Sequence, residues 1–357
     1  MAPGSVRNWG CRLEMDLVLR GWRAAVLENE LLRVTVLLDK GSNIYEFLYK
    51  PRDVDFMWRT PQGLRRPPTV PTTRADGGFL EHYEGAWQEI MPSGGPPCTL
   101  RGSQFGQHDE TPQLAWNATV VEDQPDSVAI RCSVQTARSP FLLEKTLRLV
   151  SGKPVLFIDE RLTNYGAESW PYMWGHHPAL GEPFLDETCR LDCAAQTVIV
   201  HEPHLTPTPR LPAGQRFAWP HVEDAAGRAV DLTAIPPKSL GHTDLAYLTD
   251  LTAGWYAVTN TSKRVGFGMA WDPDVFQHIW YWQAFGGNTG HPWFAATYNL
   301  GLEPWTTIPG SGLAAAVEKG TAYELEPGQS QTVRLLAVAY EGMERVGGIS
   351  LDSGHVT

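Results

Sequence analysis

Positive charge is scarce and scattered in this sequence. Its 357 residues include 29 Lys and Arg against 40 Asp and Glu, which gives a net charge of −11, and no run of more than two basic residues occurs. Because nucleic-acid binding requires a basic surface, this distribution argues against a nucleic-acid partner. A neutral or weakly charged ligand is the easier match.

Long apolar runs are absent as well, so no segment can span a bilayer. The first twelve residues contain no apolar core of the kind that defines a secretory signal. The five cysteines are an odd number, and Cys189-x-x-x-Cys193 has no second pair to complete a zinc ribbon. We therefore expect free thiols in a cytoplasmic protein that has no membrane partner.

Motifs for cofactors, metals and nucleophiles are also missing. Gly266-x-Gly268 falls inside a strand pattern with no helix after it, and no Gly-x-Ser-x-Gly elbow occurs. His201 and His204 are three residues apart, but Pro203 between them argues against the helix that a zincin-type pair requires. The sequence predicts neither a catalytic metal nor a cofactor.

Strand patterns dominate what is present. Leu143, Leu147 and Leu149 alternate with polar residues, and a turn at 151–154 leads into an apolar partner segment at 155–163, as in a hairpin. Further strands are expected at 33–38, 44–49, 255–259, 265–270, 276–285 and 330–340. We predict an all-β fold, a large antiparallel β-sandwich with few short helices, as one domain over residues 1–357 whose first 20 or so residues are peripheral.

One helix is expected at 313–319, with Ser311 as its N-cap and Gly320 just beyond its C-terminus. Residues 60–113 are rich in Pro and Gly but also contain Phe79, Tyr83 and Trp87. Because long ordered loops usually carry function, we expect this segment to line a site.

Two segments combine suitable chemistry with aromatic surroundings. His177 lies in Trp174-Gly175-His176-His177-Pro178, and Glu303 lies in Tyr298-Asn299-Leu300-Gly301-Leu302-Glu303-Pro304-Trp305. Histidine exchanges protons near neutral pH and a partly buried Glu can act as a base. Both residues are expected at strand ends. Neighbours on a strand face opposite sides, so His176 should point away from His177.

These segments, with the turn Leu325-Glu326-Pro327-Gly328 near the C-terminus, resemble the galactose mutarotase (aldose 1-epimerase) superfamily. The resemblance implies a β-supersandwich with a sugar cleft. It also implies an isomerase that interconverts the α and β anomers of a free sugar without a cofactor. By this resemblance Glu303 is the base that takes the proton of the anomeric hydroxyl, and His177 is the acid that protonates the ring oxygen.

The resemblance also indicates sugar-binding residues. His108 resembles a histidine of the family that binds sugar, although Asp109 follows it where the family has Gly, and Asp244 resembles an aspartate that binds sugar hydroxyls. Arg74 is a candidate for the family's sugar-binding arginine, and Gln88 could replace it. Stacking platforms for the sugar are expected among Trp174, Tyr281 and Trp282.

Two other functions stay open at this point. A glycoside hydrolase or lyase on the same scaffold would need either two carboxylates, which Glu303 and Asp244 could supply, or a Tyr/His pair beside an acidic sugar. A non-catalytic carbohydrate-binding protein is the other, because fold does not fix function. In each case the partner is a small sugar, and the protein is expected to be a monomer or a homodimer.

Overall fold

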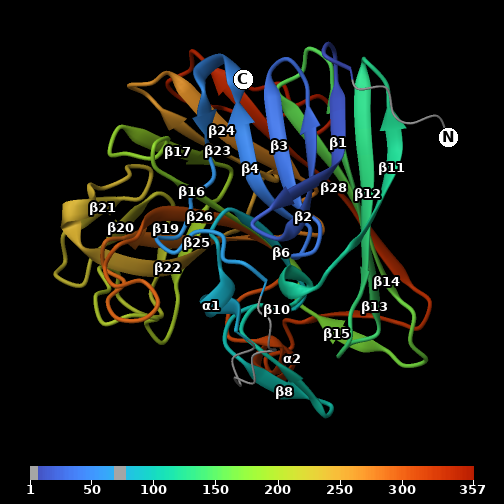
Figure 1. Ribbon diagram of the computed structural model, residues 1–357. Helices are drawn as coiled ribbons and strands as arrows, with labels where there is room; N and C mark the ends of the chain where they lie inside the picture. The colour runs from blue at the N-terminus through green and yellow to red at the C-terminus, as the bar shows by residue number, and fades with distance from the viewer. Residues whose placement is uncertain (1–6, 68–77) are drawn as a thin grey trace.

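The computed structural model describes residues 7–67 and 78–357 and is built mainly of antiparallel strands (Figure 1). The larger sheet has twelve strands in the order β1-β2-β3-β4-β6-β16-β26-β25-β22-β18-β19, with β5 paired to β4. Its strands are β1 (Arg12–Leu19), β2 (Trp22–Glu28), β3 (Leu32–Leu37), β4 (Asn43–Tyr49), β5 (Val54–Asp55), β6 (Trp87–Ile90), β16 (Gly175–Gly181), β18 (Thr197–Val200), β19 (Arg216–Ala218), β22 (His242–Thr249), β25 (His278–Phe285) and β26 (Tyr298–Trp305). The N-terminal strand β1 therefore lies at one edge of this sheet.

The second sheet has eight strands in the order β11-β12-β13-β14-β28-β24-β23-β17. They are β11 (Asn117–Asp123), β12 (Ser127–Gln135), β13 (Phe141–Val150), β14 (Val155–Asn164), β17 (Cys189–Cys193), β23 (Trp255–Asn260), β24 (Val265–Trp271) and β28 (Ser330–Glu341). The predicted hairpin is confirmed: β13 pairs with β14 in the register Leu143↔Leu162, and β13 alternates between buried and half-buried residues.

Among the described residues, four two-stranded pairs and a few short helices accompany the two large sheets. The pairs are β7 (Pro92–Ser93) with β10 (Asp109–Glu110), β8 (Cys98–Leu100) with β9 (Ser103–Phe105), β15 (Trp170–Tyr172) with β27 (Tyr323–Leu325), and β20 (His221–Glu223) with β21 (Ala229–Asp231). The helices are α1 (Phe79–His82), α2 (Leu313–Glu318) and the 3-10 turns at Lys50–Arg52, Thr111–Gln113 and Lys238–Leu240. In Figure 1, α1, β8 and α2 lie in the lower half of the view.

The two sheets share one apolar core. Phe47 on β4 meets Phe267 on β24 edge to face at 5.4 Å between ring centroids, and Phe56 adds a second ring 5.5 Å from Phe267. Aromatic side chains bury large areas, so contacts of this kind join the sheets face to face. The predicted all-β sandwich is confirmed.

The predicted helix is present as α2, but its N-terminal cap differs from the prediction. Ser311 does not cap it; the N-cap position belongs to Gly312, at φ 89°. The amide of Leu313 instead donates to the hydroxyl of Ser93, a residue from β7, at 3.1 Å. A side chain distant in sequence thus satisfies the helix end. Gly320, at φ 67°, follows the helix as expected.

Candidate active site

His177 and Glu303 lie side by side on the neighbouring strands β16 and β26. The register pairs Gly175 with Trp305 and Ala179 with Gly301, which sets His177 opposite Glu303. His177 Nε2 is 3.4 Å from Glu303 Oε1, and the two residues are only 5% and 2% exposed. The expectation that they stand at strand ends is wrong, because both are inside their strands. Each backbone is paired on its outer side, His177 with Gln88 of β6 and Glu303 with Trp280 of β25.

Glycines make room for this pair. A Cβ atom on Gly301 would come within 2.7 Å of Glu303 Oε1 and 3.2 Å of the Trp282 side chain. A Cβ atom on Gly175 would meet the Trp305 indole at 2.1 Å. The Trp305 indole N–H in turn donates to Glu303 Oε2 at 3.0 Å. The carboxyl group is thereby held with its other oxygen toward His177.

His176 points to the opposite face of β16, as predicted. Its Nδ1 accepts the indole N–H of Trp87 at 3.1 Å, and its Nε2 is 3.1 Å from a Glu160 oxygen. It belongs to a buried cluster in which atoms of Glu89, Glu160 and His176 lie within 4.8 Å of one another, a spacing that could hold a metal ion. The Lys145 ammonium lies 3.1 Å from Glu89 and already supplies a positive charge there. Since these residues come from both sheets, the cluster ties the sandwich together.

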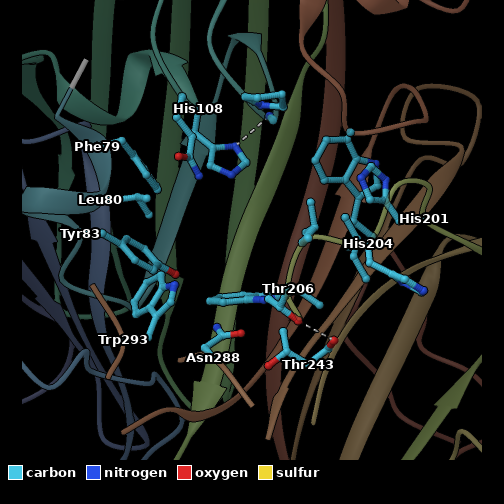
Figure 2. A pocket seen from close by; sticks show the side chains of 18 of the residues that line it. Phe79, Leu80, Tyr83, His108, His201, His204, Thr206, Thr243, Asn288 and Trp293 are labelled. Atoms are coloured by element: carbon cyan, nitrogen blue, oxygen red, sulfur yellow. Dashed lines mark hydrogen bonds between the residues drawn. The ribbon is translucent and has the colours of Figure 1, made fainter. Parts of the chain in front are cut away.

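The His177–Glu303 pair opens into a cavity of about 570 Å³. Its floor is the face of the large sheet that carries His177, Glu303, Trp280, Trp282 and Leu245, and its walls are loops. Figure 2 shows two groups of wall residues across the cavity from each other. Phe79, Leu80, Tyr83, His108 and Trp293 stand on one side, and His201 and His204 stand on the other.

Tyr83 and His108 surround the His177 ring. The Tyr83 hydroxyl is 3.4 Å from His177 Nδ1, and the His108 ring centroid is 5.4 Å from that of His177. The Gly95 amide donates to His108 Nδ1 at 3.2 Å, so the His108 proton resides on Nε2. His108 therefore offers a single N–H donor, and Tyr83 offers an oxygen to the ring nitrogen that faces away from Glu303.

Burial controls the protonation of the pair. Loss of water raises the pKa of Glu303 to about 8, and the Trp305 hydrogen bond only partly offsets this. Loss of water also lowers the pKa of His177 to about 4. Between these values the pair holds one transferable proton, which resides on Glu303 at rest. A carboxylate paired with an imidazolium contains the same number of protons, so transfer between the two groups changes no net charge.

Four of the predicted binding residues do not line the cavity. Asp244 is on the opposite face of β22 from Thr243 and Leu245, where its Oδ1 accepts the amides of Arg210 and Leu211 at 3.0 and 2.9 Å. Backbone alternation therefore turns Asp244 away from the site. Tyr281 likewise faces away from Trp280 and Trp282 and donates its hydroxyl to the Leu232 carbonyl at 3.0 Å.

Gln88 pairs with His177 in register, but its amide is engaged by the carbonyl of Gly85 at 2.5 Å and by Glu84 at 3.2 Å. Trp174 is fully buried and donates its indole N–H to Glu89 at 2.9 Å, within the cluster between the sheets. Both side chains are therefore held by hydrogen bonds inside the protein and do not line the cavity. Trp282 and His108 do line the cavity, and Arg74 lies outside the described residues.

Asp109, which stands where the resemblance expects Gly, does not enter the cavity either. Its carboxylate accepts the Gly106 amide at 2.8 Å and forms an ion pair with Arg138. The departure from the family pattern is therefore directed away from His108 and leaves the His108 side chain in the cavity wall.

Several cavity residues were missed in the sequence. Trp293 and Asn288 come from loops, and loops have no periodicity that reveals the direction of a side chain. His201 and His204 attracted attention only as a metal pair, but both line the cavity. The expectation that residues 60–113 line a site is met by Phe79, Tyr83 and His108.

Two further expectations concern the chain as a whole. All five cysteines are unpaired. Within residues 7–67 and 78–357, no helix has the length and apolarity needed to cross a membrane.

Comparison with known proteins places this arrangement in context. Among curated proteins, none matches the sequence. A Klebsiella pneumoniae protein provisionally named an aldose 1-epimerase superimposes with a TM-score of 0.70 at 16% identity, over 92% of this chain and 83% of its own. A galactose mutarotase-like protein from Clostridium acetobutylicum gives a TM-score of 0.64 at 14% identity, over 93% and 99%. One from Lactobacillus casei gives 0.54 at 14%, over 89% and 100%.

These similarities establish the galactose mutarotase-like fold. The family model described as a domain of unknown function, DUF4432, matches residues 19–338, most of the chain. The protein is therefore a member of the DUF4432 family with a galactose mutarotase-like fold.

Proposed function

We propose that this protein is an aldose 1-epimerase, an isomerase that interconverts the α and β anomers of a free sugar. The observation that carries the proposal is the 3.4 Å approach of His177 Nε2 to Glu303 Oε1 at the floor of an aromatic cavity. Anomer exchange needs one group that takes a proton and one that gives a proton, and both are present at one place. The shared fold supports the same reading.

The chemistry balances with one proton held by the pair. Glu303, as a carboxylate, takes the proton of the anomeric hydroxyl while His177, as an imidazolium, gives its proton to the ring oxygen. The bond between the anomeric carbon and the ring oxygen breaks, and its electron pair stays on the oxygen that becomes a hydroxyl. Rotation about the first carbon–carbon bond and closure with the roles reversed give the other anomer.

The surroundings favour this proton exchange. Once His177 becomes an imidazolium, both of its nitrogens carry protons, and Nδ1 can donate to the Tyr83 oxygen that lies 3.4 Å away. The Trp305 indole N–H stabilises the carboxylate of Glu303. Sugar hydroxyls bound beside the pair can donate further hydrogen bonds to the Glu303 carboxylate, which lowers the cost of forming the charged pair.

Aromatic rings supply the remaining sugar contacts. Trp282 and Trp293 line the cavity with ring centroids 6.0 Å apart, and Phe79 stacks on Tyr83 at 5.0 Å. Their flat apolar faces complement the C–H faces of a pyranose, while the His108 Nε2–H can donate to a hydroxyl. A neutral sugar suits this lining.

A hydrolase with two carboxylates receives less support. Such enzymes place two carboxyl groups about 5–10 Å apart across the scissile bond. Among the described residues that line the cavity, Glu303 is the only one with a carboxyl group, because Asp244 faces the other side of the sheet. The remaining alternative is a sugar-binding protein without catalytic activity. The anomer-exchange assay below distinguishes it from an epimerase.

The test is anomer exchange followed by NMR on freshly dissolved α-glucose, α-galactose and other aldoses. His177→Asn and Glu303→Gln should each lower the exchange rate by at least about a hundredfold, the usual contribution of a general acid or base. His355→Asn and Glu318→Gln, the same substitutions at exposed positions, serve as matched controls. A wild-type rate no higher than the buffer rate on the whole panel would refute the proposal.

A further inference from the structure

The cavity extends well beyond the catalytic pair of His177 and Glu303. Its floor crosses four neighbouring strands, from His177 on β16 through Glu303 on β26 and Trp282 on β25 to Leu245 on β22. Adjacent strands lie about 4.8 Å apart, so these three steps cover about 14 Å. His177 and Glu303 occupy one end of this length.

One sugar ring cannot fill that length. With bonds of about 1.5 Å, a pyranose measures about 6 Å between hydroxyl oxygens on opposite sides. Volume leads to the same result. An aldohexose of about twelve non-hydrogen atoms occupies less than about 360 Å³, even at the 30 Å³ that liquid water takes per oxygen. The cavity holds about 570 Å³.

Polar groups in fixed positions line the far end of the cavity, the end away from His177 and Glu303. The Tyr247 hydroxyl accepts the Gly310 amide at 2.8 Å and is hydrogen-bonded to His201 Nδ1. Because the hydroxyl accepts the Gly310 amide, its own proton can be donated to His201 Nδ1, and burial lowers the pKa of His201 to about 4. In this arrangement the proton of the neutral ring is on Nε2. His201 is only 4% exposed and lines the cavity, so it is a fixed donor at the end away from the catalytic pair.

Two further polar groups at this end have no partner. The Thr243 hydroxyl and the Asn288 side-chain oxygen make no hydrogen bond to any described residue, although both residues line the cavity and are 3% exposed. Figure 2 shows them beside Thr206, which donates to the Thr243 carbonyl at 3.2 Å. An unsatisfied buried polar group costs about 1–3 kcal/mol, so buried groups of this kind are normally satisfied by a ligand or water.

Charge limits what this end accepts. Among the described residues that line the cavity there is no Lys, Arg or Asp, and Glu303 is at the other end. A phosphate or carboxylate would lack a cation, and an ammonium would lack a carboxylate. Leu245 and Trp280 provide an apolar floor beneath the polar rim of His201 and Thr206. This combination suits a second uncharged sugar ring.

We propose that the substrate is a neutral reducing oligosaccharide of at least two rings. Its reducing ring lies over His177 and Glu303, and the next ring lies over Leu245 between His201 and Asn288. This inference rests on the proposed epimerase function and adds a second subsite to it.

The test compares glucose and galactose, each alone and as the reducing ring of 1→3-, 1→4- and 1→6-linked disaccharides. At least one disaccharide should exceed its own monosaccharide at least tenfold in kcat/KM for anomer exchange. His204→Ala, an exposed change at the far rim, should lower that ratio at least threefold. The matched change His355→Ala should leave it within twofold.

Binding gives a second readout that does not depend on turnover. Quenching of tryptophan fluorescence in the Glu303→Gln variant should give a Kd at least tenfold lower for the preferred disaccharide than for its monosaccharide. If the disaccharide binds more tightly but the wild type exchanges the anomers of no sugar, the second subsite is upheld and the epimerase function is refuted. Exchange in which every monosaccharide equals or exceeds its disaccharides, or a ratio untouched by His204→Ala, would overturn the second subsite alone.

Discussion

The shared proton of His177 and Glu303 predicts a bell-shaped pH dependence of kcat/KM. Below about pH 4 both groups are protonated and no base remains, because burial lowers the pKa of His177 to about 4. Above about pH 8 both are unprotonated and no acid remains, because burial raises the pKa of Glu303 to about 8. The value of kcat/KM should be flat near pH 6, because the active form is the singly protonated pair. It should fall about tenfold per pH unit below about pH 4 and above about pH 8.

The fall of kcat/KM above about pH 8, the upper limb of the profile, is the better limb to measure, because acid unfolding does not interfere at this pH. Anomer exchange is followed by NMR from pH 6 to 10 with the buffer rate subtracted at each pH, and circular dichroism confirms that the protein stays folded. Trp305→Phe removes the 3.0 Å hydrogen bond that favours the Glu303 carboxylate. A hydrogen bond to a charged group contributes about 1.5–3 kcal/mol, so the upper limb should move up by about one to two pH units. Glu318→Gln, at an exposed position, should leave it in place.

Two results would refute this reasoning. A kcat/KM that keeps rising between pH 8 and 10 would mean that the fully deprotonated pair is active, so that no acid from the pair is needed. An upper limb that does not move in folded Trp305→Phe would mean that the limb does not report Glu303.

Three further outcomes are expected. Tyr83→Phe removes the oxygen near His177 Nδ1 but keeps the ring that stacks on Phe79, so kcat should fall about two- to tenfold with KM little changed in steady-state exchange assays. Glu303 is protonated when folded up to about pH 8 and ionised when unfolded above about pH 4.5, so its contribution to stability is lost as pH rises. The unfolding free energy of the wild type relative to Glu303→Gln should fall by about 1.4 kcal/mol per unit between about pH 5 and 8 in urea titrations, and a constant difference would contradict the assigned pKa. Lys145→Met leaves the buried carboxyl of Glu89 without its cation and should cost about 3–5 kcal/mol in urea unfolding, whereas a loss below 1 kcal/mol would show that the cluster does not depend on this charge.

Local patterns in the sequence were sufficient for much of the fold. The period-two alternation of 143–149 and the turn after it predict a hairpin, because alternate side chains of a strand face opposite sides. The same rule separates His177 from His176, and the structure has His176 in the cluster between the sheets. The two aromatic segments at 174–178 and 298–305 also indicated His177 and Glu303, and the fold brings these two residues together.

Other outcomes depended on strand register and on loops. Asp244 and Tyr281 have suitable chemistry, but each faces the wrong side of its strand, and no local pattern states which side of a two-sided buried sheet holds the cavity. The helix cap from Ser93 could not be foreseen either, because its donor and acceptor belong to different elements.

The sequence by itself therefore determined one hairpin, several of the longer strands and the chemical identity of the catalytic candidates, since these depend on near neighbours and on residue type. Only the tertiary structure decided that His177 and Glu303 stand 3.4 Å apart. It also decided that Tyr83, His108 and His201 wall one cavity. The physical reason is that the pairing of β16 with β26 and the approach of three loops are set by the packing of the whole sandwich, in which register is fixed by burial over many residues.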